Sequence, residues 1–323
     1  MTRVGLVLGA GGTVGQAYHA GVLAALEHDL GWDPRSADVI VGTSAGSITG
    51  ALLRLGVPAA ELAAWAVQAP LRLDGGAVED WLSRERPQFP PFTPRHWLRP
   101  WRPPSPALVA KMARRPWSVR PAVAALTCAP RGRVDLLVHA GALEELAGEW
   151  PEGLRVCAVR RHDGERVAFG AEGAPAAALA TAVASSCAIP GYFAPVRIGG
   201  REYVDGGVHS PSNADALAGD ELDVVIAVSP MSTSTRVRAL DAPVRYAAHR
   251  RLVRELRRLE RRGVTVVRFE PGGRSLAAMG INMMADDRAD AVVQAAFIEA
   301  GGMAAGRLLA DRLAPVRARA AAQ

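Results

Sequence analysis

Residues 42–46 read GTSAG, the G-x-S-x-G pattern that is typical of serine nucleophiles. The apolar run Asp38–Val41 precedes this pattern, and a segment with helical periodicity, Ala45–Leu55, follows it. A serine on a tight turn between a strand and a helix exposes its hydroxyl, and Gly42 and Gly46 avoid collisions with neighbouring backbone. The helix also places positive potential where an oxyanion would develop. The pattern therefore predicts Ser44 as the nucleophile of an acyl transfer.

A second glycine cluster follows the first apolar run, Arg3–Leu8, and consists of Gly9, Ala10, Gly11 and Gly12. Its backbone N–H groups can bind the oxygen of an acyl group, because glycine leaves the approach open. The alternative is a dinucleotide-binding loop. That fingerprint, G-x-G-x-x-G, requires a glycine where this chain has Val14. We expect an oxyanion hole and keep nucleotide binding as the alternative.

A serine hydroxyl needs a general base, and histidine is the usual one. None of the seven histidines lies in the context of a late-chain catalytic triad. His209 is the nearest candidate, and a structural role explains it better. The histidines therefore leave the base unassigned.

Five short blocks occur in a fixed order: GAGG, HAGVL, GTSAG, ASSCAIPGYFAPV and DGG. In this order they resemble the patatin-like phospholipases, from Val4 to about Asp215. That family uses a Ser–Asp dyad without histidine on an α/β/α sandwich. The resemblance implies Ser44 as nucleophile, Asp205 as base and the Gly9–Gly12 loop as oxyanion hole. It also implies hydrolysis of acyl esters in lipids, with no metal and no cofactor.

The residues around Asp205 fit this role. Asp205 ends the short apolar run Glu202–Val204, and Gly206 and Gly207 let the backbone turn so that the carboxylate can meet Ser44. A second Asp-Gly-Gly begins at Asp74. The family places its aspartate after the ASSCAIPGYFAPV block, which favours Asp205.

The glycine loop departs from the family pattern in one respect. The family commonly has an arginine shortly after the glycines, where this chain has Thr13-Val14-Gly15. The departure leaves open how the loop is held. Because of this departure we also consider a second alternative to a hydrolase, namely a non-catalytic descendant that binds a lipid or a partner protein.

Short apolar runs alternate with helical segments along the chain, which predicts a mostly parallel sheet covered by helices. We expect a three-layer α/β/α sandwich in a single domain, residues 1–323. The dipeptide Asp163-Gly164 between two apolar runs predicts a hairpin. Residues 84–120 are rich in proline, tryptophan and arginine, and we expect an irregular insertion or lid there. Residues 243–323 should hold C-terminal helices and the last strand, with one long helix from about 286 to 313.

Composition limits the class of protein and its partners. A hydrophobic fraction of 49% and a charged fraction of 22% indicate a folded globular chain. Three scattered cysteines without C-x-x-C spacing argue against a disulfide framework or a zinc site and fit a reducing compartment. The longest uncharged stretch, 173–196, is interrupted by prolines and does not resemble a membrane span. We therefore expect a cytoplasmic protein.

The net charge of +6 comes almost entirely from arginine. Arginines are dense between Arg245 and Arg262, where Leu252, Leu256 and Leu259 form an apolar stripe at helical spacing. This pattern predicts a helix that packs on the core and has a basic outer face. Such a face favours peripheral contact with an anionic membrane surface. No nucleic-acid motif is present, and we expect no nucleic-acid partner.

Overall fold

The computed structural model describes residues 2–73, 76–84, 98–137, 146, 148–235 and 241–322. The strands of this part form one eight-stranded sheet in the order β5-β6-β3-β2-β1-β7-β8, with β4 also paired to β3. The strands are β1 (Val4–Leu8), β2 (Val39–Thr43), β3 (Leu154–Arg160), β4 (Glu165–Phe169), β5 (Val196–Ile198), β6 (Arg201–Asp205), β7 (Val224–Val228) and β8 (Thr265–Phe269).

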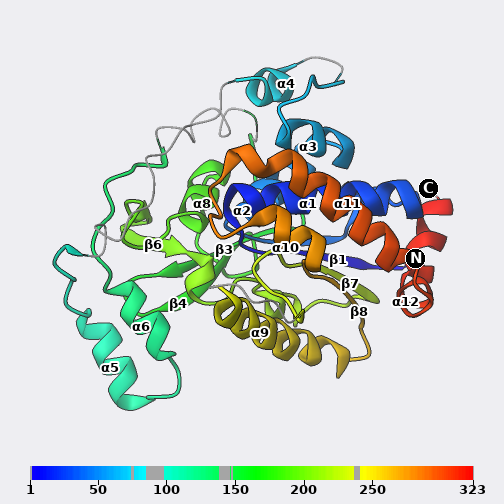
Figure 1. Ribbon diagram of the computed structural model, residues 1–323. Coiled ribbons are helices and arrows are strands. Elements are labelled where there is room, and N and C mark those ends of the chain that lie inside the picture. The colour runs from blue at the N-terminus through cyan, green and yellow to red at the C-terminus, as the bar shows by residue number, and fades with distance from the viewer. Residues whose placement is uncertain are drawn as a thin grey trace.

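Helices surround this sheet (Figure 1). They are α1 (Gly12–Leu30), α2 (Ala45–Arg54), α3 (Ala59–Ala66), α4 (Ala77–Leu82), α5 (Pro106–Arg114), α6 (Pro121–Thr127), α8 (Leu179–Ser186), α9 (Ala242–Glu260), α10 (Gly273–Met279), α11 (Ala289–Ala305) and α12 (Arg307–Ala321). The short 3-10 helices with described bounds are η1 (Pro34–Ser36), η4 (Gly206–Val208), η5 (Ala214–Leu217) and η6 (Asp286–Arg288).

The central strands β3, β2, β1, β7 and β8 run parallel to one another. Every residue of β1, β2 and β7 is buried, as expected for parallel strands that have helices on both faces. Helices α1, α2, α8 and α11 cover one face, and α9 covers the other (Figure 1). The predicted mixed α/β fold with a mostly parallel central sheet is confirmed.

The remaining strand pairs are antiparallel and lie at one side of the sheet. Strands β3 and β4 pair from Val156 opposite Phe169 to Arg160 opposite Glu165, around the predicted Asp163-Gly164 turn. Strand β6 pairs antiparallel with β3 and with β5. The hairpin prediction is confirmed, and this side of the sheet is the one that carries the candidate site.

Two expectations from the sequence need correction. The segment 84–120 is not irregular throughout, because α5 is a nine-residue helix. Ser105 caps this helix by accepting from the Leu108 N–H, and Pro106 occupies its first turn, where a missing N–H costs nothing. The last helix is also not continuous. It divides into α11 and α12 at Gly306, whose backbone is extended.

Candidate active site

The predicted nucleophile Ser44 lies between β2 and α2 in a conformation that side chains rarely adopt. Its φ is 52° and its ψ is −122°, outside the helical and extended regions. Such strain persists only where the surroundings fix it, and it is concentrated at functional sites. Only 7% of the residue surface is exposed. The geometry matches the strained strand-to-helix turn expected from the GTSAG pattern.

The two glycines of the pattern are required by close backbone contacts. A Cβ atom at Gly46 would lie 2.0 Å from the carbonyl oxygen of Leu8 on β1. A Cβ atom at Gly42 would lie 2.5 Å from the Cα atom of Ser47. Any side chain at either position would push α2 away from the sheet, so the two glycines let the turn close on β1.

Ser186 of α8 holds the backbone of the turn and was not identified from the sequence. The Ser44 N–H donates to the Ser186 hydroxyl oxygen at 2.8 Å, and that hydroxyl donates to the Cys157 carbonyl at 2.6 Å. The Ser47 hydroxyl donates to the Ser44 carbonyl at 2.6 Å. Ser186 lies inside the ASSCAIPGYFAPV block, so the block marked the right segment without assigning a role to this residue.

The candidate base Asp205 meets the Ser44 turn at one edge of β3. Strand β2 pairs with β3 up to Thr43 opposite Cys157, and β6 pairs with β3 from Asp205 opposite the next residue, Ala158. Strand β4 pairs with β3 over both of these stretches, so it occupies the other edge. Strands β2 and β6 therefore share one edge of β3, and their carboxyl ends point at each other. This arrangement brings Ser44 and Asp205 together, although they are far apart in the sequence.

The Asp205 carboxylate is buried and has few partners. Only 6% of the residue surface is exposed, and its backbone N–H donates to the Ala188 carbonyl at 2.9 Å. Burial raises the pKa of Asp205 to about 6, and hydrogen bonds from the Gly207 N–H and the Ser44 side chain limit the rise. The Gly207 N–H lies 2.7 Å from Oδ1. A buried carboxylate with a raised pKa beside a serine hydroxyl is suited to proton transfer.

Gly206 lets the chain after Asp205 lie against β3. A Cβ atom at this position would be 2.2 Å from the Cys157 carbonyl oxygen. Asn213, a second residue that sequence reasoning missed, fixes the same turn. Its side-chain amide donates to Thr43 Oγ1 at 3.1 Å and to the Gly206 carbonyl at 3.2 Å. Asn213 thus joins the residue before Ser44 to the residue after Asp205.

The glycine loop divides into two pairs. The N–H groups of Gly9 and Ala10 donate to the carbonyls of Val228 and Pro211, at 2.9 and 2.7 Å. Those of Gly11 and Gly12 have no hydrogen-bond partner among the residues that the structure describes. Gly12 is also the first residue of α1, where N–H groups carry positive potential. Gly11 and Gly12, whose N–H groups the sequence singles out as the donors of an oxyanion hole, are therefore the two loop residues with N–H groups free of described partners.

The loop is held without the arginine that the family commonly has. The Val14 N–H donates to the Met283 carbonyl at 3.2 Å, and the Gly15 N–H donates to the Gly11 carbonyl at 2.9 Å. Gly12 has a φ of +59°, and a Cβ atom there would lie 2.5 Å from the Met283 oxygen. The segment around Met283 thus takes over the support of the loop.

A model of the patatin-like phospholipase family matches residues 6–218. This span covers more than half of the chain and includes the glycine loop, Ser44 and Asp205. The chain belongs to the patatin-like phospholipase family.

Among solved structures, the chain is similar to VipD from Legionella pneumophila. The identity is 15%, the TM-score is 0.40, and the match covers 94% of this chain. The chain spans 66% of the VipD structure, slightly less than two thirds. A comparison with curated proteins gives no match.

In this member of the patatin-like phospholipase family, His209 and Cys187 are chemically unsuited to act as base or nucleophile. His209 is bonded through Nδ1 to Asn213 Oδ1 at 3.0 Å, and burial lowers its pKa to about 4. Burial raises the pKa of Cys187, which is near Ser44, to about 12, so its thiol stays protonated. Asp74, in the second Asp-Gly-Gly, lies outside the described residues.

No group of three or more His, Cys, Asp or Glu residues is placed to hold a metal ion in the described part of the chain. None of the helices in the described ranges combines the length and the apolar character that crossing a bilayer requires.

Proposed function

We propose that this protein is a serine acyl hydrolase that cleaves carboxylic ester bonds of lipids, as a phospholipase A, lysophospholipase or esterase does. Ser44 is the nucleophile and Asp205 is the general base. The observation that carries the proposal is the meeting of β2 and β6 at one edge of β3, which joins a strained serine to a buried carboxylate. Family membership supports a lipid ester as the substrate.

In the proposed reaction, the Ser44 hydroxyl oxygen attacks the ester carbonyl carbon while Asp205 accepts the hydroxyl proton. The carbonyl oxygen becomes an oxyanion and is bound by the N–H groups of Gly11 and Gly12. Each donor of this kind typically raises kcat by about 10²–10³-fold. Asp205 returns the proton to the departing alcohol, which leaves an acyl-serine. Asp205 then takes a proton from the water that attacks the acyl-serine and returns it to the Ser44 oxygen as the bond to the acyl group breaks, which releases the fatty acid and restores the free serine.

The pKa of Asp205 suits this cycle. At its ordinary pKa an aspartate is a weak base towards an alcohol. Burial raises the pKa to about 6, which makes the carboxylate a better proton acceptor and leaves it mostly ionised at pH 7. We therefore expect kcat/KM to fall as the pH drops below about 6, because the base becomes protonated.

The test combines a fluorophosphonate probe with medium-chain nitrophenyl esters. Ser44→Ala and Asp205→Asn should lower kcat/KM by at least about 10³-fold. The matched control for serine is Ser185→Ala, since the Ser185 hydroxyl donates to the Ala182 carbonyl within its own helix. Asp74→Asn tests whether the aspartate of the other Asp-Gly-Gly motif acts as the base instead of Asp205. Both controls should retain labelling and turnover.

A folded wild-type protein that neither reacts with the probe nor cleaves any ester would contradict the proposal. A non-catalytic descendant that binds a lipid or a partner protein would then be the better description. Binding of a dinucleotide to the Gly9–Gly12 loop would be the other alternative, and ligand-induced change in Tm would detect it. It is disfavoured because β2 ends at the Ser44 turn rather than at a ribose-binding carboxylate.

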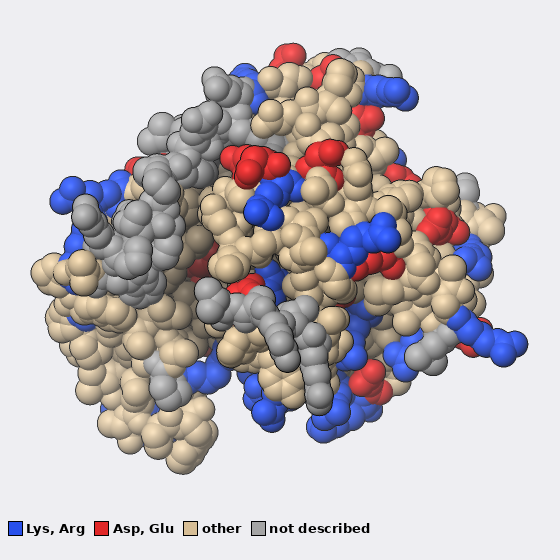
Figure 2. Space-filling view, in the orientation of Figure 1, with Lys and Arg blue, Asp and Glu red and all other residues tan. Residues whose placement is uncertain are grey.

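Peripheral contact with an anionic membrane is the second part of the proposal. The exposed arginines of the α9 region support it, and Figure 2 displays basic side chains gathered where Figure 1 places α9. Charge reversal of Arg254 and Arg257, both exposed, should abolish salt-sensitive sedimentation with phosphatidylserine vesicles. Sedimentation that persists in this double variant would contradict a role for α9.

A further inference from the structure

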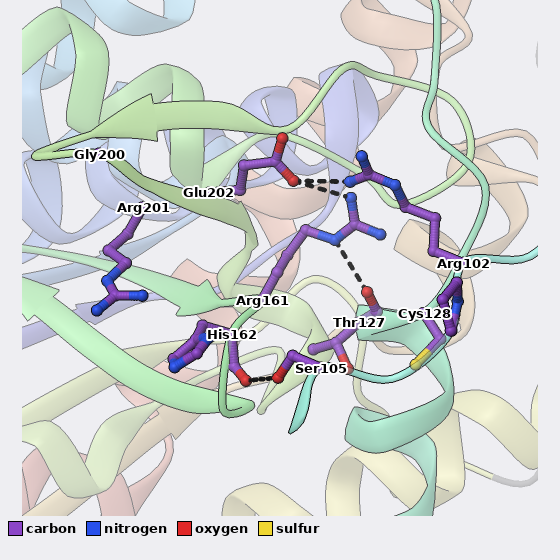
Figure 3. Close-up of a pocket in the computed structure, with 10 residues that line it drawn as sticks. Arg102, Ser105, Thr127, Cys128, Arg161, His162, Gly200, Arg201 and Glu202 are labelled. Atoms are coloured by element: carbon purple, nitrogen blue, oxygen red, sulfur yellow. Dashed lines mark hydrogen bonds and ion pairs between the residues drawn. The ribbon is translucent and has the colours of Figure 1, made fainter. Parts of the chain in front are cut away.

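A cavity of about 320 Å³ lies at the amino end of β6, where Gly200, Arg201 and Glu202 form part of its lining (Figure 3). Its lining includes Arg102, Arg161, Arg201 and Glu202, but neither Ser44 nor Asp205. Side chains alternate between the two faces of a strand, so Glu202 and Asp205 project from opposite faces of β6. The cavity is large enough for a small ligand.

Four arginines converge on the Glu202 carboxylate, and two of them, Arg102 and Arg161, line this cavity. Glu202 pairs with Arg102 at 2.8 Å, Arg131 at 3.0 Å, Arg161 at 3.3 Å and Arg197 at 3.8 Å. We call these four arginines and Glu202 the arginine pocket. One carboxylate cannot neutralise four guanidinium groups, so three positive charges of the pocket have no paired carboxylate among the described residues.

Arg161 is the fixed member of the arginine pocket. Only 8% of the residue is exposed. Its Nε donates to the Thr127 carbonyl at 2.9 Å, and Nη2 donates to the Ala129 carbonyl at 3.0 Å. Burial lowers the pKa of Arg161, and the nearby charges of Arg102 and Arg131 lower it further despite Glu202. The neighbouring positive charges thus disfavour the protonated form of the buried Arg161 guanidinium.

Arg102 and Arg131 supply the donors that a ligand could use. In each of them only Nη1 has a hydrogen-bond partner among the described residues, and that partner is Glu202. The Arg102 backbone N–H donates to the Cys128 carbonyl at 2.8 Å, which fixes the base of its side chain. The remaining guanidinium N–H groups of both residues face no described acceptor.

We propose that the arginine pocket binds a phosphate group, carried either by the headgroup of an anionic phospholipid or by a small phosphate ester. Planar guanidinium groups bind phosphate oxygens in pairs, and a phosphate monoester brings close to two negative charges. A carboxylate ligand would compensate only one. Leu98 and Trp101, which precede Arg102, have exposed fractions of 82% and 48%, and they provide apolar contact if the phosphate belongs to a lipid.

The first experiment measures binding to the full chain carrying Ser44→Ala, so that hydrolysis cannot interfere. Inorganic phosphate and glycerol 3-phosphate are titrated by calorimetry in a buffer without phosphate. Sedimentation is measured with phosphatidylcholine vesicles that contain or lack phosphatidic acid. Arg102→Gln should weaken whichever interaction is observed by about tenfold or more, because hydrogen bonds to charged groups are lost.

Arg268→Gln is the matched control. Arg268 is 45% exposed and lies 3.4 Å from Glu270, whereas Arg102 is 44% exposed and lies 2.8 Å from Glu202. The two substitutions therefore remove the same charge from equally exposed, paired arginines. Arg268→Gln should leave binding within about twofold, since it changes only the long-range potential, which salt screens.

A substitution with the opposite expected sign separates binding from a purely structural role. Glu202→Gln removes the only carboxylate of the arginine pocket, so phosphate binding should become tighter. Arg131→Gln should weaken binding as Arg102→Gln does, and thermal unfolding shows that each variant is folded.

Binding of the soluble phosphates that depends on Arg102 would identify a free phosphate ester as a sufficient ligand. Binding only to vesicles with phosphatidic acid, again dependent on Arg102, would identify the lipid headgroup. Both results support the proposal. No binding of any probe, or equal losses in Arg102→Gln and Arg268→Gln, would overturn it. Because the binding measurements do not require Ser44 or Asp205 chemistry, either proposal can fail without the other.

Discussion

Two carboxylates on strand β6, three residues apart, have their pKa values shifted in opposite directions. Burial raises the pKa of Asp205 to about 6, because only hydrogen bonds from the Gly207 N–H and the Ser44 side chain offset the loss of hydration of the carboxylate. Burial also acts to raise the pKa of Glu202, but the hydrogen bond and charge of Arg102, with the charges of Arg161 and Arg131, hold it below its ordinary value. Asp205 is buried with few partners, whereas Glu202 is half-buried among arginines, so the depth of burial and the partners together decide which form each carboxylate takes.

The same strand therefore serves two regions that are built by different means. At the carboxyl end, the backbone approaches closely at glycines, charge is scarce, and a carboxylate is kept basic. At the amino end, long arginine side chains gather around a carboxylate whose charge they stabilise. The first arrangement is suited to proton transfer, and the second to holding an anion.

The largest effect is expected from Gly46→Ala, which tests whether close packing holds the Ser44 turn. Its Cβ atom would lie 2.0 Å from the Leu8 carbonyl oxygen, so α2 must move off β1. We expect a loss of more than about 4 kcal/mol in the free energy of unfolding, or no folded protein. Denaturant unfolding measures this change.

Gly302→Ala in α11 is the control for that substitution. A Cβ atom at Gly302 meets no atom within 4 Å, so alanine should stabilise the protein by about 0.5–1 kcal/mol. A Gly46→Ala variant of wild-type stability would show that the turn does not depend on this contact.

The pH dependence of stability tests the opposite pKa shifts directly. The folded-state pKa of Asp205 lies above its unfolded value of about 3.8, so folding disfavours its ionised form. This penalty is absent below pH 3.8, grows as the pH rises to about 6, and then stays constant. Asp205→Asn should therefore raise the free energy of unfolding at pH 7 by about 2–3 kcal/mol and should change it little at pH 4.

Glu202→Gln should have the opposite sign. The folded-state pKa of Glu202 is lowered, so its ionised form adds stability above the unfolded pKa, and this stability is lost as the pH falls. The variant should be less stable than the wild type at pH 7 and should approach it in acid. Urea unfolding at pH 4 and 7 measures both variants. Shifts of equal sign would show that the two carboxylates do not differ as described.

A smaller effect is expected within the arginine pocket. Arg161→Met leaves the Thr127 and Ala129 carbonyls without a donor and should cost about 2 kcal/mol of unfolding free energy. Arg197→Gln should change it by less than about 0.5 kcal/mol, because Arg197 is 71% exposed and 3.8 Å from Glu202. Equal losses, measured by urea unfolding, would show that burial does not distinguish these two members of the pocket.

Much of the fold could be predicted because its signals are local. The runs Val4–Leu8, Val39–Thr43 and Val224–Val228 are almost entirely apolar and are buried on both faces, and glycine turns and helices follow two of them. The start of α5 was missed even though Ser105-Pro106 is a typical helix start, because the surrounding prolines suggested an irregular segment. The break at Gly306 was missed because an alanine-rich sequence continues on both sides.

The sequence predicted the two reactive residues of the candidate site but not the hydrogen bonds that hold them in place. The GTSAG pattern and the family resemblance named Ser44 and Asp205. Neither signal predicted that Ser186 and Asn213 tie the two turns to each other and to β3. The contacts of Ser186 with Ser44 and of Asn213 with Thr43 join residues 142 and 170 positions apart, and hydrogen-bonding side chains of this kind have no periodicity by which to recognise them.

By itself, the sequence determined the family, the mostly parallel sheet and the glycine-flanked serine, since each depends on residues that are neighbours in the chain. Only the tertiary structure decided that β2 and β6 share an edge of β3, that Gly11 and Gly12 keep their N–H groups free of described partners, and that four arginines surround Glu202. The physical reason is the same in each case. Strand register and the convergence of long side chains depend on how distant segments pack, and no local pattern of residue types encodes that packing.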